Sequence, residues 1–280
     1  MSPLGYINRY INLIIETLRQ VGAVRIWLLL SGWAFFQWLL LFALESYPSS
    51  WVHGPVSFLL SLYDPAEATG FKHYPGHYLL LPKFFDWGRF WMGALIEGAV
   101  LGVVARIYYG RFVGSVPGGR SPFEGIGRML IHIVPAWLTI NGLTIMISLF
   151  VPDLAQPFIH ASPRATAVFE WIVMPSAYAL VWALFFFLIP SIAMYRDTFG
   201  RALRRSLSIF LQNPITSLFL SAMVLAGPFV ISSLAGKTVT IVEKFHPEMV
   251  YWALVVELAV EVVAYYMWMG TAVRFLVEVE

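Results

Sequence analysis

The chain has 280 residues, of which 59% are hydrophobic and only 12% are charged, and its formal net charge is +2. Soluble domains carry about 25% charged residues, so this composition excludes an ordinary soluble protein, and the small net charge does not favour nucleic-acid binding. The absence of cysteine excludes disulfides, thiolate nucleophiles and cysteine metal sites.

The first part of the chain predicts an amphipathic helix followed by two membrane spans. Isoleucines and a leucine recur at helical spacing over residues 6–19, with polar residues on the opposite face. Residues 26–44 carry no charge and, at about 1.5 Å per residue, are nearly long enough to cross a hydrocarbon core of about 30 Å. After a polar stretch over 45–88, residues 90–109 predict a second span, which contains Glu97 and Arg106.

The middle of the chain predicts a second amphipathic helix and two further spans. Ser121 and Glu124 have the spacing of a capping box, which predicts a helix over 121–134 that Pro135 ends. The third span follows, to residue 151. The fourth covers about 167–193, and its prolines predict kinks.

The last part repeats this arrangement most clearly. Phe199 to Gln212 places apolar residues on one helical face and arginines on the other, and Asn213-Pro214 ends the helix. Residues 215–234 and 249–275 predict the fifth and sixth spans. We therefore predict an all-α polytopic membrane protein with six transmembrane helices and interfacial amphipathic elbow helices.

The pattern also suggests internal repetition within one integral membrane domain over residues 1–280. Each of three units would hold an amphipathic helix, a span, a loop and a second span. The units cover 6–110, 121–195 and 197–275. Hydropathy supports this division better than residue identity does, and a coincidental triplication is the alternative.

The distribution of lysine and arginine predicts the orientation. The termini and the loops on their side of the membrane carry 12 of the 18 basic residues, and the other three loops carry 6. Both termini are therefore expected in the cytoplasm. The amphipathic helices would then present a set of arginines to anionic lipid headgroups at the cytoplasmic face: Arg128, Arg201, Arg204 and Arg205.

Carboxylates inside the predicted spans are the main candidates for function. Glu257 and Glu261 are one turn apart on one helix face, Tyr265 follows four residues later, and Glu97 lies deep in the second span. Two carboxylates in hydrocarbon cannot both be charged at low cost, so they would form a proton or cation site or a polar substrate path. The alternative is a structural role, in which they bond to neighbouring helices or to a partner subunit.

No sequence motif predicts catalysis, a metal or a cofactor. His73 and His77 are four residues apart, but the intervening Pro75-Gly76 argues against a regular helix there, and a site with His53 is the less favoured hypothesis. The sequence contains no H-E-x-x-H, G-x-S-x-G or phosphate-binding glycine motif. A membrane enzyme that uses these histidines is the third hypothesis for function.

The segment Ala202-Leu203-Arg204-Arg205-Ser206, preceded by FFLIPSIAMYRDTFG, resembles a pattern found in two families. It is similar to the A-L-x-R-S-W segment of YciC-type inner-membrane proteins and of the membrane domain attached to some glycerophosphodiester phosphodiesterases. Leu207 stands where those families have tryptophan, and the match covers about 35 residues. The resemblance implies a six-span bacterial inner-membrane protein concerned with envelope or lipid homeostasis, and it implies no catalytic residue.

Taken together, these features predict a non-enzymatic multi-pass membrane protein that acts in transport, lipid handling or envelope assembly. The alternative is a structural integral-membrane subunit of a larger complex, which the 22 phenylalanines and 11 tryptophans would suit. Membrane lipids are the expected partners, with a membrane-protein partner or a second copy of the chain as a further possibility.

Overall fold

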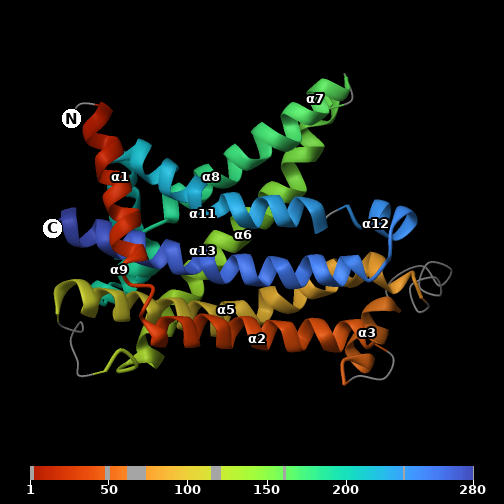
Figure 1. Ribbon diagram of the computed structural model, residues 1–280, viewed down its shortest axis with the longest axis horizontal. Coiled ribbons are helices and arrows are strands. Elements are labelled where there is room, and N and C mark those ends of the chain that lie inside the picture. The colour runs from red at the N-terminus through yellow and green to blue at the C-terminus, as the bar shows by residue number, and fades with distance from the viewer. Residues whose placement is uncertain are drawn as a thin grey trace.

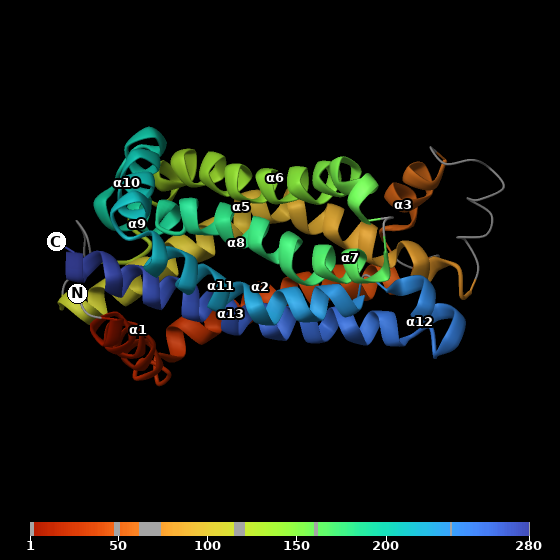
Figure 2. The ribbon, with the colours of Figure 1, turned by 90° about the horizontal axis from the view of Figure 1, so that it is seen from above.

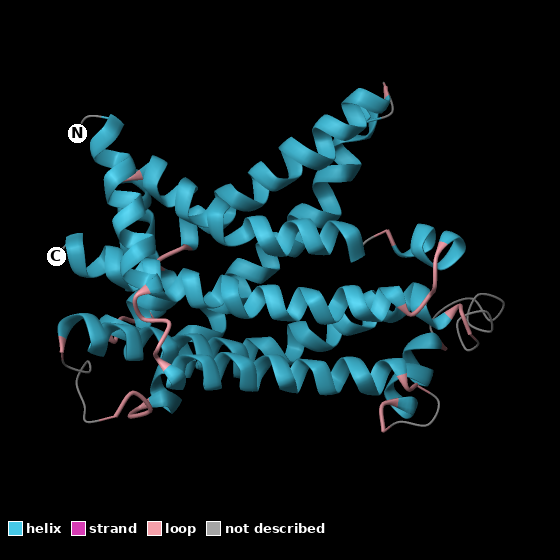
Figure 3. Ribbon diagram, viewed as in Figure 1, coloured by secondary structure: helices cyan, strands magenta, loops and turns pink. Residues whose placement is uncertain are grey.

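The computed structural model describes residues 3–47, 51–61, 74–114, 121–159, 162–235 and 237–279, and within these ranges it contains helices but no strand (Figures 1 and 3). The helices, in chain order, are α1 Pro3–Leu18, α2 Val24–Glu45, α3 His53–Leu60, α5 His77–Val113, α6 Ile126–Ile159, α7 Pro163–Val168, the π-helix η1 Phe169–Val173, α8 Met174–Phe185, α9 Leu188–Tyr195, α10 Phe199–Gln212, α11 Pro214–Ala235, α12 Thr238–Lys244 and α13 Met249–Val279.

Six helical segments among the described residues are long and apolar enough to cross a membrane, which confirms the predicted fold class. They are Val24–Glu45, His77–Val113, Ile126–Pro157, Pro163–Tyr195, Pro214–Ala235 and Met249–Val279. Both chain termini lie at one end of the bundle, on the left in Figures 1 and 2, and we call this the terminal end. The opposite end, which holds α3 and α12, is the distal end.

Helices α5 and α13 form the centre of the bundle. The α5 helix packs on α2, α6, α9 and α13, while α13 also packs on α1, α2 and α11. Close approach of α5 and α6 depends on small residues, as is common between membrane helices. A Cβ atom at Gly98 would lie 2.7 Å from Ile133 Cγ2, and one at Gly93 would lie 2.6 Å from the Trp137 ring.

The short helices α1 and α10 lie at the terminal end, across the direction of the long helices (Figures 1 and 2). On α10, Ala202, Ser206 and Ile209 are buried against the bundle, whereas Arg201 and Arg204 are exposed. Arg205 differs from these two arginines. It contacts Asp197 at 3.1 Å and covers the Tyr195 ring, so much of its charge is directed back to the protein.

The predicted amphipathic helix over 121–134 is wrong as a separate element. Residues 121–125 form a turn, Gly125 has a φ of +68°, and α6 then runs without interruption through Pro135. Proline removes only one backbone donor from a helix, and membrane helices tolerate this loss where neighbouring groups are satisfied. The division into three units remains a prediction, and its second unit lacks a separate elbow helix.

Arg106 shows why the 121–125 turn has this shape. Arg106 lies near the end of the predicted second span, where a long basic side chain is expected to extend to the membrane interface. In the structure its side chain is instead buried, with 3% of the residue exposed. Its Nε donates to the Ala193 carbonyl at 3.1 Å, and its NH1 donates to the carbonyls of Pro122 and Glu124 at 3.2 and 2.6 Å. One guanidinium therefore joins α5, α9 and the turn before α6.

The fourth span is broken into four pieces, and its prolines explain the breaks. Pro175 follows the π-turn η1, and Pro190 follows the break between α8 and α9. Proline at 190 cannot donate to the Phe186 carbonyl, and the indole of Trp268 donates to that carbonyl instead at 2.9 Å. In Figure 1, α7 and α8 lean away from α11 towards the distal end.

A polar contact joins the two chain segments that enter α5 and α13 at the distal end. The Tyr74 hydroxyl donates to a Glu248 carboxylate oxygen at 3.0 Å. Two hydrogen bonds lower the pKa of Glu248 below its ordinary value: the larger effect comes from the backbone N–H of Glu248 and the smaller from the Tyr74 hydroxyl. The hydrogen bond between Tyr74 and Glu248 also raises the pKa of Tyr74.

Candidate functional site

A buried arginine lies between two carboxylates at the interface of α5 and α13. Arg89 NH2 donates to both oxygens of Glu261 at 2.5 Å, and Arg89 NH1 lies 3.7 Å from a Glu257 oxygen. The side chains are only 15%, 12% and 10% exposed for Arg89, Glu261 and Glu257. One positive charge therefore faces two acidic groups in an apolar bundle, where unpaired charge is costly.

The geometry of this group follows from helix periodicity. Glu257 and Glu261 are one turn apart, so they present both carboxylates on the same face of α13. A single guanidinium nitrogen of Arg89, NH2, donates to both carboxylate oxygens of Glu261, and a hydrogen bond between two charged groups is stronger than one between neutral groups. Because this bidentate pairing occupies the NH2 group, Glu257 receives the weaker and longer contact.

Glu97 forms the next part of the polar interior, two turns further along α5. Its carboxylate accepts hydrogen bonds from the indoles of Trp33 and Trp137 at 3.1 and 2.9 Å and from the Tyr265 hydroxyl at 2.8 Å. These hydrogen bonds join α5 to α2, α6 and α13. Glu97 itself is only 5% exposed. With Tyr265 one turn beyond Glu261, a continuous series of polar side chains runs along the α5–α13 interface.

A cavity of about 890 Å³ lies beside this interface, between α6, η1, α8 and α11. Most of its lining is aromatic or aliphatic, and four acidic or basic side chains join this lining: Asp86, Glu170, Lys237 and Glu257. Trp171 and Val230 line the cavity and are also 51% and 45% exposed, so it opens sideways on the apolar surface of the bundle. This volume suits a drug-sized ligand or part of a larger one.

Irregular helix geometry creates the space. The π-turn η1 and Pro175 lie on one wall, and Pro228 lies within α11 on the facing wall. Because π-turns and prolines bend helices, the two walls diverge towards the distal end. Figure 2 shows α8 and α11 as neighbours across this region.

Asp86 connects the cavity with the buried arginine. It lies three residues before Arg89 on α5 and is exposed, and its side chain has no hydrogen-bond or ion-pair partner among the residues that the structure describes. Glu257, which also lines the cavity, is buried and contacts Arg89. The cavity wall formed by α5 and α13 is therefore acidic.

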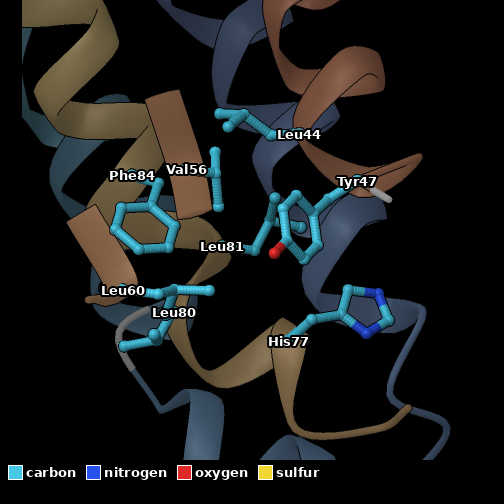
Figure 4. Close-up of a pocket in the computed structure, with 8 residues that line it drawn as sticks. All are labelled: Leu44, Tyr47, Val56, Leu60, His77, Leu80, Leu81 and Phe84. Atoms are coloured by element: carbon cyan, nitrogen blue, oxygen red, sulfur yellow. The ribbon is translucent and has the colours of Figure 1, made fainter. Parts of the chain in front are cut away.

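A second pocket lies at the distal end, between the end of α2, α3 and the start of α5 (Figure 4). Its volume is about 10 Å³, which holds no more than one water molecule. The side chains that converge on it are Leu44, Tyr47, Val56, Leu60, His77, Leu80, Leu81 and Phe84. This pocket is too small for a substrate.

The structure brings together all four intramembrane candidates that the sequence predicts. Glu257 lines the cavity, Glu261 lies behind it on Arg89, and Tyr265 joins Glu97 in the interior. Of the predicted basic residues, Arg128, Arg201 and Arg204 are exposed, and Arg205 binds Asp197. Within the described ranges no group of three His, Asp or Glu side chains is placed to hold a metal, and His73 lies outside these ranges.

Sequence reasoning missed Arg89 as a member of this site. The sequence pattern places Arg89 between the polar stretch and the second span, among the six basic residues of the other three loops, but α5 begins at His77 and carries Arg89 three turns into the helix. Asp86 and Arg89, three residues apart, gave a local signal that the helix extends further. Lys237 and Glu170 were missed because cavities between helices leave no periodic signal.

Comparisons of this chain with family models, with curated proteins and with solved structures find no match.

Proposed function

We propose that this protein is a non-enzymatic membrane protein that handles lipids or related amphiphiles through the cavity between α8 and α11. The observation that carries the proposal is the cavity itself, with apolar walls, a sideways opening and charged groups on its lining. An amphiphile matches this combination, because its chains suit the apolar walls and its polar end requires the charged groups. The resemblance to proteins of envelope or lipid homeostasis is in keeping with this proposal.

The proposed orientation places both termini, α1 and α10 in the cytoplasm of a bacterial cell, with the protein in the inner membrane. The excess of lysine and arginine at the terminal end supports it. Exposed arginines at that end, among them Arg128, Arg201 and Arg204, would then contact anionic headgroups. The cavity would open to the outer leaflet, because it faces the distal end.

Cysteine labelling tests this orientation, because the natural sequence has no cysteine. We expect a membrane-impermeant maleimide, added to intact spheroplasts, to label Lys244→Cys on α12 and not Ser208→Cys on α10. Both positions are exposed, so both variants should be labelled after the membrane is permeabilised. Labelling of Ser208→Cys alone in intact spheroplasts would reverse the orientation.

Photolabelling tests lipid handling. Ala226 is an exposed residue of the cavity lining on α11, and tryptophan at this position would fill part of the space. We expect Ala226→Trp to reduce labelling by a phospholipid with a photoreactive acyl chain about tenfold, which corresponds to about 1.4 kcal/mol of binding free energy. The protein should be the full chain in liposomes.

Ala259→Trp is the matched control, because Ala259 is exposed on α13 and does not line the cavity. It should leave labelling unchanged. Equal labelling of both variants would contradict lipid binding in the cavity. A second membrane protein that co-purifies in fixed ratio and protects the cavity from labelling would instead support the alternative, a structural subunit of a larger complex.

A further inference from the structure

We propose that the cavity selects a zwitterionic phospholipid with an amine headgroup, with Lys237 binding the phosphate and Asp86 and Glu257 binding the ammonium group. This inference rests on the proposed function and names the substrate class of the same cavity. It is carried by the arrangement of opposite charges on one lining. A headgroup with both charges is the lipid chemistry that satisfies both sets of groups.

The charged groups lie at the depth where headgroups are found. With 37 residues, α5 is about 55 Å long, well beyond a hydrocarbon core of about 30 Å. At the terminal end, Arg106 on α5 contacts the end of α9. Asp86 lies about 20 residues before Arg106 on the same helix, and a helical segment of this length crosses the hydrocarbon core. Lys237 follows two residues after α11, whose 22 residues also suffice to cross the core.

The two polar sides of the cavity have unused binding capacity. Lys237 is exposed and has no ion pair or hydrogen bond from its side chain to any residue in the described ranges, and Asp86 has none either. Glu257 shares Arg89 with Glu261, which occupies the guanidinium more closely. Three carboxylates, those of Asp86, Glu257 and Glu261, therefore face one arginine, and a bound ammonium group would correct the imbalance.

The apolar part of the lining suits acyl chains. Much of the remaining wall is formed by apolar side chains such as Ile145, Trp182 and Leu225. The aromatic rings of Trp171 and Tyr178 lie on the same lining as Glu170 and offer additional surface for a cationic headgroup. An anionic lipid such as phosphatidylglycerol would bring its phosphate to Lys237 but would offer no cation to the acidic wall.

The test is competition between two photoreactive lipids of identical acyl chains, phosphatidylethanolamine and phosphatidylglycerol, on the full chain in liposomes. We expect the natural sequence to favour phosphatidylethanolamine by about fivefold to tenfold, the range that one or two partly exposed ion pairs provide. Asp86→Asn and Glu257→Gln should each lower the preference towards unity. Lys237→Glu should weaken labelling by both lipids.

Two variants serve as matched controls, Asp153→Asn on α6 and Lys244→Glu on α12. Both residues are exposed and neither lines the cavity, so they should leave the lipid preference unchanged. Thermal unfolding measured on each variant separates loss of selectivity from loss of fold. Glu257→Gln and Asp86→Asn both retain the size of the side chain, and Asp86 makes no hydrogen bond or close ion pair with any of the described residues.

The outcomes separate this inference from the proposed function. If both lipids label the protein equally and Ala226→Trp still reduces this labelling, the headgroup assignment is overturned and lipid handling stays in place. Labelling that Ala226→Trp does not reduce would overturn both. Inhibition by soluble glycerophosphoethanolamine at concentrations equal to those of the lipid would show that the site takes a free headgroup compound, which also overturns the lipid assignment.

Discussion

Replacement of Arg89 by methionine is expected to lower the free energy of unfolding by about 3–5 kcal/mol, the cost of removing one partner from a buried ion pair. The loss arises because Glu257 and Glu261 remain in the α5–α13 interface without their cation. The measurement is unfolding of the purified protein in mixed micelles with increasing denaturing detergent. The two helices should separate first, since this pair joins them.

The control is Lys83→Met, which removes a positive charge from an exposed position of the same helix. It should change stability by less than about 0.5 kcal/mol, as surface substitutions usually do. A triple variant, with Arg89→Met, Glu257→Gln and Glu261→Met, should recover most of the loss, because buried ion pairs can be replaced by apolar groups. If Arg89→Met and Lys83→Met unfold at the same concentration of denaturing detergent, the ion pairs of Arg89 do not hold the two helices together.

Replacement of Glu97 by leucine is expected to have a comparable effect through a different mechanism. The carboxylate accepts from Trp33, Trp137 and Tyr265, and leucine would leave these three buried donors without their acceptor. Each unsatisfied buried donor costs about 1–3 kcal/mol, so the total should reach about 3 kcal/mol or more. The same micellar unfolding measurement would detect this loss.

Glu97→Gln distinguishes lost acceptors from lost packing. Glutamine keeps the shape of the side chain and one acceptor oxygen, so we expect it to lose less stability than leucine. Glu243→Leu on α12, where the residue is exposed, controls for the general effect of replacing glutamate by leucine. Equal stability of Glu97→Leu and Glu97→Gln would show that the three hydrogen bonds contribute little.

The six spans could be predicted because membrane crossing depends on local composition. A run of about 20 apolar residues is visible in the sequence without knowledge of its neighbours. The shared face of Glu257, Glu261 and Tyr265 was predictable for the same reason, since helical periodicity is local. Local periodicity therefore identifies these residues as candidates without any knowledge of their partners.

The partners themselves could not be predicted. Arg89 and Glu261 are 172 positions apart, and Glu97 and Tyr265 are 168 apart, so only tertiary packing brings them together. Pro135 shows the opposite error, because a local rule predicted a helix end that the surrounding bundle overrides. The cavity was also beyond sequence reasoning, since it arises from how far η1, α8 and α11 diverge.

The most direct test of the account is the position at which a photoreactive phospholipid attaches to the natural sequence. Mass spectrometry of the digested protein identifies this position. We expect attachment within 171–182 of η1 and α8 and within 222–233 of α11, the segments that face each other across the cavity. Attachment spread over the exposed faces of α2 and α13, with none in these two segments, would contradict lipid binding in the cavity.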